Sequence, residues 1–383
     1  MKPDDNFGSS VKFFIAVIAL TVIGIVLKEL SNIFVPFVIA YFLFFVFAPL
    51  NMQLKRIKFP LFAIILLDII ITFLFSWGIS KIIISSFLSF GESLPIYESK
   101  LNDIISSTAI SIGITDPFFT KFSLQNVLSK INYQALVGGV FTSTFSVMGN
   151  ILFILFFFVF VISGHDSVYD VIRNHYVEIK MKIKLKNLRK EYSKKEESIE
   201  NTKLFEQKIA EAEDQESRKI SDTFKSITDQ IQRYVITKTG MNLGAGVTVG
   251  IALSIFGLDF AIIWGVFVFL FNFIPTIGST IALILPVLMA LIQSESISYA
   301  LLITAVIAGL QTVFFNLLEP MIIGKRLNLN PIVILFSVLI WGYIWGIPGM
   351  LLSVPLTAII KIILSNSESQ HMHFISDLMS ASK

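Results

Sequence analysis

The stretches FNFIPTIGS (Phe271–Ser279) and WGYIWGIPGM (Trp341–Met350) each interrupt a long apolar run. The first run extends from Phe260 to Ile292, and the second from Ile332 to Leu364. Paired apolar segments broken by proline and glycine are typical of the solute site of a secondary transporter. Non-helical backbone is tolerated at membrane depth only where it is buried in protein or lines a cavity. The two breaks therefore indicate a polytopic transport protein and mark the place of its site.

The composition supports a membrane class. Of 383 residues, 54% are apolar and 37 are phenylalanine, which suits lipid-facing helices. The formal charge of +3 carries little information, but the absence of cysteine excludes disulfides, thiolate catalysis and cysteine-ligated metals.

Eight hydrophobic segments are long or apolar enough to enter a bilayer, given that a crossing helix needs about 20 mostly apolar residues. They are Val11–Leu27, Ile33–Leu50, Leu61–Ser80, Val137–Ser163, Met241–Phe256, Phe260–Ile292, Ile297–Leu318 and Ile332–Leu364. The first run lacks a small-residue cleavage site and indicates a membrane helix rather than a signal peptide.

The two interrupted runs are longer than one crossing requires. Two helical halves that meet at Pro275 and at Pro348 fit this length, so we expect an all-α protein of about six transmembrane helices plus two re-entrant hairpins. Two long single spans are the alternative. Lys55, Arg56 and Lys58 follow the second span and indicate a cytoplasmic loop, which also places both termini in the cytoplasm of a bacterial cell with the protein in its inner membrane.

The predicted organisation has six parts. They are three N-terminal transmembrane helices (1–88), an extracytoplasmic amphipathic segment (89–136), a fourth transmembrane helix (137–164), a charged cytoplasmic helical arm (165–238), a transport core (239–364) and a polar cytoplasmic tail (365–383).

The arm between His165 and Lys238 holds sixteen Lys/Arg and fourteen Asp/Glu. Its basic stretch Lys180–Lys195 is expected to attract anionic lipid, by about 1 kcal/mol per residue. Apolar spacing of three and four farther along predicts an amphipathic or coiled-coil helix that packs on itself or on a second subunit, which favours a homo-oligomer. Because the acidic residues nearly cancel the basic ones, no nucleic-acid partner is expected.

The run from Gln311 to Pro355 resembles the autoinducer-2 exporter (AI-2E) family of bacterial inner-membrane permeases. The resemblance rests on Gln311, Asn316, Pro320, Gly324, Pro331, Gly342, Gly346, Gly349 and Pro355, and on the FIP-x-x-G element Phe273–Gly278. Ser279 departs from it where a proline is expected, and Asn330 where a histidine often stands. The resemblance implies transport, either of the signalling molecule autoinducer-2 or of sodium or lithium in exchange for protons.

Two carboxylates within or beside membrane segments are candidates for ion coupling, since ionisable groups are costly there. Glu319 ends the Ile297–Leu318 segment and faces either the cavity between the hairpins or a basic partner at Lys325 or Arg326. Asp68 lies inside the third span and has either a coupling role or a structural hydrogen bond to a neighbouring helix.

Uncharged polar residues near the breaks form the second candidate set: Asn272, Thr276, Ser279, Gln311, Asn316 and Ser353. The breaks themselves involve Pro275, Gly278, Pro286, Gly346, Pro348, Gly349 and Pro355. Freed carbonyls and half-helix N-termini can bind a cation or an anionic group there. Alternatively, these side chains only satisfy backbone groups freed by the prolines.

The sequence therefore predicts a secondary transporter that exports a small solute by alternating access coupled to an H⁺ or Na⁺ gradient. A Na⁺(Li⁺)/H⁺ antiporter is the alternative within the family, and a non-transporting membrane scaffold whose arm recruits a partner is the alternative outside it. Neither a phosphate-binding loop nor a catalytic or metal motif occurs, so no enzyme activity, cofactor or metal is expected.

Overall fold

The computed structural model describes residues 5–116, 119, 149–165, scattered positions between 167 and 181, and residues 199–275, 277–323, 329–365, 367 and 370–380. These residues are helical and contain no β-strand; a single isolated bridge joins Leu329 and Ser380. Five helices in the described part are long and apolar enough to cross a membrane, namely Ser31–Arg56, Leu61–Ser111, Ile277–Ser294, Ile297–Ile322 and Pro331–Ser365. The predicted class, an all-α polytopic membrane protein, is confirmed.

The N-terminal part consists of α1 (Asp5–Glu29), α2 (Ser31–Arg56) and α3 (Leu61–Ser111). A further apolar helix, Gly149–His165, buries Phe158 against Ala40 and Phe47 of α2. The first part of the fourth predicted span and nearly all of Lys180–Lys195 lie outside the described residues.

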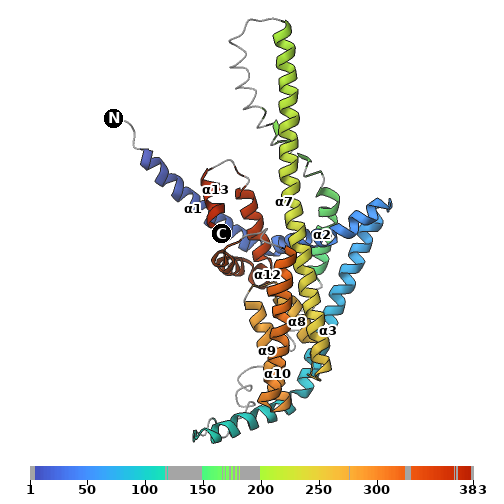
Figure 1. The fold of residues 1–383 in the computed structure, drawn as a ribbon, viewed down its shortest axis with the longest axis vertical. Helices are drawn as coiled ribbons and strands as arrows, with labels where there is room; N and C mark the ends of the chain where they lie inside the picture. Colours follow the sequence, from blue (N-terminus) through green and yellow to red (C-terminus); the bar gives the residue numbers. More distant parts are fainter. Residues whose placement is uncertain are drawn as a thin grey trace.

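Helix α3 is longer than the sequence pattern predicts. The third span was expected to end at Ser80, followed by short amphipathic helices, but α3 continues as one helix of 51 residues to Ser111. Figure 1 shows its last part turning away at the foot of the bundle. The extension is held because Tyr97 is buried against the core and its hydroxyl donates to Asp259 Oδ2 at 2.8 Å.

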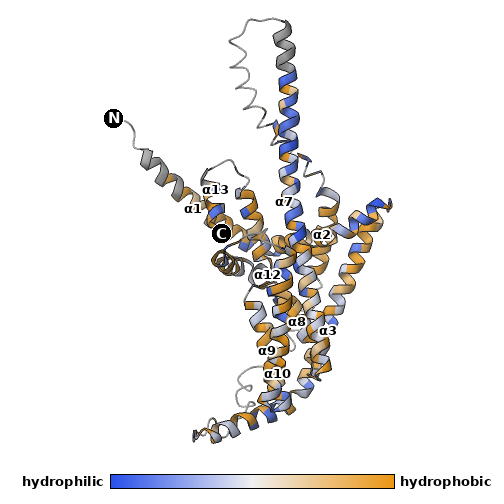
Figure 2. Cartoon of the chain, viewed as in Figure 1, coloured by the Kyte–Doolittle hydropathy of each residue, from blue (hydrophilic) through white to orange (hydrophobic). Residues whose placement is uncertain are grey.

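Helix α7 (Ile199–Ile255) joins two parts that the sequence pattern separates. Its first half is the charged arm and its second half is the predicted span from Met241, and the 57 residues form one helix. Figure 2 shows the polar half projecting from the bundle and the apolar half packed within it.

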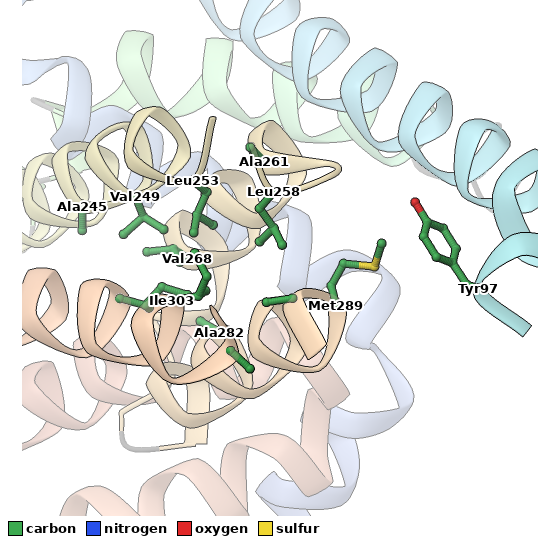
Figure 3. Close-up of a cluster of buried hydrophobic side chains, with 13 residues drawn as sticks. Tyr97, Ala245, Val249, Leu253, Leu258, Ala261, Val268, Ala282, Met289 and Ile303 are labelled. Atoms are coloured by element: carbon green, nitrogen blue, oxygen red, sulfur yellow. The ribbon is translucent and has the colours of Figure 1, made fainter. Parts of the chain in front are cut away.

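The core is built on the apolar half of α7. Helices α8 (Ala261–Phe271) and α10 (Ile297–Gln311) pack against it, and α9 (Ile277–Ser294) packs against α8 and α10. Helix α10 is followed by a π-helix, η1 (Thr312–Leu318), and by α11 (Glu319–Ile323). Figure 3 shows the side chains of Val249, Val268 and Ile303 meeting from three of these helices. Burial of such side chains contributes roughly 1.5–3 kcal/mol each in water, and in lipid the same contacts act through close packing.

The first interrupted run folds as a helical hairpin, with α8 and α9 as its arms. Its base is closed by Gln293, which accepts a hydrogen bond from the Asp259 amide and donates one to the Gly257 carbonyl, both at 2.8 Å. Lys100 of α3 donates to the Gln293 carbonyl and lies 3.5 Å from Glu295. Because Gly257 follows the end of α7, this base lies at the end of the core opposite the arm.

The second interrupted run is α12 (Pro331–Ser365), which reverses direction within its length. Trp341 Nε1 donates to Thr357 Oγ1 at 3.3 Å, whereas sixteen residues of straight helix would separate these positions by about 24 Å. The reversal occurs at Gly346 (φ 64°, ψ −142°), not at Pro348, where the two halves were expected to meet. Only glycine adopts this backbone without strain, so it sets the turn.

A glycine closes each hairpin at nearly the same relative position. A Cβ on Gly278 would lie 1.7 Å from the carbonyl oxygen of Phe271, and one on Gly349 would lie 1.9 Å from that of Trp341. The two arms therefore touch through backbone. Both runs have the reversal expected of hairpins rather than of long single spans, and their depth in the membrane stays a prediction.

The hairpins open toward opposite ends of the core. At the base of the second hairpin, Leu329 and Ile362 share a buried cluster with Ile231 and Val235, which lie on the arm side of α7. The tail helix α13 (Gln370–Leu378) adjoins this base, where the Asn330 amide donates to the Met379 carbonyl at 2.9 Å. At the tip, Trp345 Nε1 donates to the carbonyl of Leu27 in α1 at 2.9 Å.

Candidate transport site

The predicted carboxylate Glu319 forms an ion pair with Lys238. Lys238 Nζ donates to both carboxylate oxygens, at 3.0 and 2.9 Å, and the two side chains are 12% and 20% exposed. The pair joins the start of the apolar half of α7 to the end of η1 across 81 residues of chain. The partners expected from the sequence, Lys325 and Arg326, lie outside the described residues.

Aromatic side chains shield this ion pair from solvent. The Lys238 ammonium lies 5.1 Å from the ring centre of Phe315, a cation–π distance. Tyr234, one turn earlier on α7, is 8% exposed. Burial, and secondly the Glu319 charge, raise the pKa of its hydroxyl, so Tyr234 stays protonated beside the pair.

Three polar side chains of α7 and α10 have buried atoms that lack a hydrogen-bond partner within the described part of the chain. They are Thr239 (Oγ1), Asn242 (Nδ2 and Oδ1) and Gln311 (Nε2). Asn242 is fully buried and Gln311 is 9% exposed. Unpaired buried polar atoms cost about 1–3 kcal/mol each and call for an explanation beyond packing.

These side chains lie near one another along two antiparallel helices. The Lys238–Glu319 pair and the close approach of Gly244 to Phe314 fix the register of α7 against η1. In that register Asn242 and Gln311 lie within about one helical turn of each other. We call Lys238, Thr239, Asn242, Gln311 and Glu319 the polar cluster.

The π-helix η1 spans the residues between Gln311 and Glu319. π-helical segments are rare and are frequently found at functional sites. Asn316, inside η1, lies on the exposed face and not in the polar cluster, whereas Gln311 is buried.

Polar candidates at the breaks bond to nearby backbone. Asn272 Nδ2 donates to the Val268 carbonyl at 2.7 Å, and Ser353 Oγ donates to the Met350 carbonyl at 2.7 Å. Both side chains are buried, as are Pro286 and Pro355 within their helices. Ser279 lies in the first turn of α9, and Thr276 lies outside the described residues. Both side chains bond to a carbonyl three or four residues earlier in the chain, and their role at the site stays a prediction.

Asp68 lies apart from the polar cluster, between α2 and α3. It is fully buried, and Asn51 Nδ2 donates to its Oδ2 at 2.8 Å. The bond reaches a neighbouring helix, as the structural alternative for Asp68 expects.

The sequence analysis missed Lys238, Asn242 and Asn51. Lys238 could have been found from the sequence, because it is the last charged residue before the apolar half of α7. Asn242 follows it by four residues and so shares its face of the helix.

The fold defines a polytopic helical membrane protein with a buried charged and polar cluster beside a broken hairpin. Comparison with known proteins gives its class. Residues 200–369 match the model of the AI-2E family transporters. The matched region contains the whole polar cluster and both hairpins.

Relatives agree with this match. The chain is 28% identical over 359 residues to the "Putative transport protein" of Borreliella burgdorferi, covering 92% of this chain and 86% of the relative. It is 25% identical over 359 residues to a Haemophilus influenzae protein with the same name, covering 92% and 91%. It is 38% identical over 139 residues to the AI-2 transport protein TqsA of Escherichia coli, covering 36% of this chain and 40% of TqsA.

These comparisons support an AI-2E family transporter, and the apolar helices make it a multi-pass membrane protein. The resemblance seen at Gln311–Pro355 is thereby confirmed.

Proposed function

We propose that this protein is a secondary transporter of the bacterial inner membrane. It exports a small organic solute of the autoinducer-2-like class by alternating access, coupled to an H⁺ or Na⁺ gradient. The observation that carries the proposal is Asn242, a fully buried amide whose donor and acceptor both lack a partner in the described part of the chain.

The chemistry of the polar cluster suits such a solute. A small sugar-derived molecule offers hydroxyl groups that donate and accept, and the free amide of Asn242, the Gln311 Nε2 and the Thr239 hydroxyl complement them. A solute that reached these side chains would supply the missing hydrogen-bond partners, which would favour its binding.

The neighbouring ion pair supplies a means of coupling. A proton or cation that neutralises Glu319 would release Lys238, and the freed charge would favour a rearrangement of α7 against η1. In this proposal, the two hairpins, whose bases lie at opposite ends of the core, open the cluster alternately to the two sides of the membrane.

The test uses everted membrane vesicles that contain the full chain. We expect autoinducer-2 to accumulate in them when a proton or sodium gradient is imposed, and Asn242→Leu to lose at least ten-fold of the rate. Leucine keeps the branched shape of the side chain and removes both unpaired groups. Gln53→Leu, at an exposed position of α2, is the control and retains the rate. Equal rates in wild type and Asn242→Leu would contradict the proposal.

Na⁺(Li⁺)/H⁺ antiport is a second candidate function, favoured by the nearly buried Glu319 carboxylate. The same vesicles report it through a pH-sensitive dye on addition of sodium or lithium salt. Cation-dependent proton movement that is lost in Glu319→Gln, without solute flux, would replace the first proposal. If neither solute flux nor cation-dependent proton movement is found, and deleting the charged arm abolishes the protein's cellular function, the scaffold alternative is favoured.

The proposal also covers membrane orientation, lipid contact and oligomeric state. Both termini lie in the cytoplasm, the Lys180–Lys195 stretch contacts anionic lipid, and the protein acts as a homo-oligomer. Vesicles with and without anionic lipid, and the mass of the purified protein in lipid nanodiscs, test these points.

A further inference from the structure

A second buried polar site lies between α2 and α3, outside the polar cluster. It consists of Asn51, Asp68 and Thr72, which are 8%, 0% and 9% exposed. Asn51 Nδ2 donates to Asp68 Oδ2 at 2.8 Å, while Thr72 Oγ1 donates to the backbone carbonyl of Asp68 and not to its carboxyl group.

Two oxygen atoms at this site have no hydrogen-bond donor among the described residues. Asn51 Oδ1 and Asp68 Oδ1 are both buried, and neither has a hydrogen-bond partner among the residues that the structure describes. An ionised carboxylate only accepts hydrogen bonds, and the amide oxygen does the same. Each of the two oxygens is therefore an acceptor without a donor among the described residues.

No described cation neutralises Asp68. Ion pairs in the described part include those of Lys100 with Glu295, Arg218 with Asp214, and Lys238 with Glu319, and none of these cations is paired with Asp68. A lone buried carboxylate in a membrane helix is strongly unfavourable unless its charge is removed.

Titratable groups on the elements packed against α2 include Lys28 and Glu29 of α1, Tyr234 and Lys238 of α7 and Lys361 of α12, while α3 itself carries Lys81 and Glu92 farther along. Helix α2 carries Tyr41, Lys55 and Arg56, of which the last two are exposed, and the helix Gly149–His165 carries only His165, which contacts Tyr41. Helices α8 and α9 carry no charged residue.

We propose that Asp68 holds a proton on Oδ1 and shares it with Asn51 Oδ1, so that α2 and α3 are joined by a neutral acid–amide pair. One hydrogen then satisfies both orphaned oxygens and removes the buried charge. The bound proton is the ligand of this site, and its release would leave a bare carboxylate between two packed helices.

The site is linked to the transport core through α2. Phe45 of α2 shares a buried cluster with Tyr234 and Val235 of α7, immediately before Lys238. We infer that protonation of Asp68 contributes to coupling together with the Lys238–Glu319 pair, a role that rests on the proposed transport function. Proton binding itself does not depend on that function.

The first experiment detects the proton directly. Infrared spectra of the full chain in lipid bilayers at neutral pH separate the carbonyl stretch of a protonated carboxyl group from that of a carboxylate. We expect a protonated-carboxyl band that disappears in Asp68→Asn and persists in Asp103→Asn, the matched control, because Asp103 is an exposed carboxylate on the same helix.

A second variant keeps the test decisive if Asp68→Asn does not fold. Asn51→Leu removes the amide but keeps the acid, so the same band is expected to move to the frequency of a less hydrogen-bonded carboxyl group. A spectrum without the band, or with a band that neither variant alters, would overturn the proposal. A sodium-dependent change at this site, lost in Asp68→Asn, would assign it to a metal cation and would also overturn it.

Transport measurements distinguish this proposal from the proposed function. If the band is present but vesicles carry no solute, the transport function fails and the proton site stands. If both hold, Asp68→Asn, which mimics the protonated acid, makes solute flux independent of the imposed proton gradient.

Discussion

Lys238 on α7 donates to both carboxylate oxygens of Glu319 at the end of η1, and this pair sets the register of the polar cluster. Removing one partner leaves the other charged and nearly buried. We therefore expect Lys238→Met and Glu319→Gln each to lower the free energy of unfolding by about 3 kcal/mol. Denaturation of the purified variants in detergent measures the loss.

The double variant Lys238→Met/Glu319→Gln distinguishes the effect of the pair on stability from its effect on coupled transport. With both charges removed, most of the stability is expected to return while gradient-driven transport stays lost. The Arg218–Asp214 pair, whose side chains are 77% and 61% exposed, is the control, since Asp214→Asn should change stability by at most about 0.5 kcal/mol. A double variant as unstable as the singles would show that the pair does not act as a unit.

The hairpin glycines predict a steric effect. Alanine at Gly278 or at Gly349 would place a methyl group against the carbonyl of Phe271 or Trp341, so each variant should lose about 1–3 kcal/mol or more. In contrast, Gly309→Ala in α10 meets no atom within 4 Å and should be neutral or stabilising by up to about 1 kcal/mol. Thermal melting of the three variants checks this, and equal melting temperatures would contradict direct backbone contact in the hairpins.

Tyr234 predicts a pH dependence. Because its pKa is raised in the folded state by burial and by Glu319, its contribution to stability is complete below pH 10, its ordinary pKa, and decreases as pH rises further. The difference in unfolding free energy between wild type and Tyr234→Phe should fall above pH 10 by about 1.4 kcal/mol per pH unit. Tyr343→Phe, at a position 75% exposed, is the control. A constant difference across this range would contradict the burial of the hydroxyl.

Labelling tests the orientation of the core, and the cysteine-free sequence makes it simple. Ser294 lies at the base of the first hairpin and Glu211 on the exposed arm, at opposite ends of α7. A cysteine at Ser294 should react with an impermeant thiol reagent in intact cells, and a cysteine at Glu211 only after lysis. The reverse pattern would invert the predicted topology.

Much of the fold could be predicted from local pattern. Apolar runs of sufficient length predict the helices, and their broken centres predict the two reversals, because both depend on residues close in sequence. The second turn was placed at Pro348 rather than Gly346 because proline marks a helix break but a positive φ decides where the chain turns.

The site could be predicted only in part. Glu319 and Asp68 are visible because a carboxylate in an apolar run is unusual at any position. Their partners are not visible, since Lys238 is 81 residues from Glu319 and Asn51 belongs to another helix. The continuity of α7 and the length of α3 were missed for a related reason, because a change from polar to apolar composition does not break a helix.

Helix α7 also has a mechanical consequence. From Ile199 to Lys238 it extends about 60 Å, and from Lys238 to Ile255 about 25 Å, at 1.5 Å per residue. If α7 pivots at the ion pair, a tilt of about 10° within the core moves the far end of the arm by about 10 Å. The movement at the free end of α7 is therefore larger than the movement in the core. A molecule bound to that end would restrict the tilt of α7 and so slow the conformational change in the core.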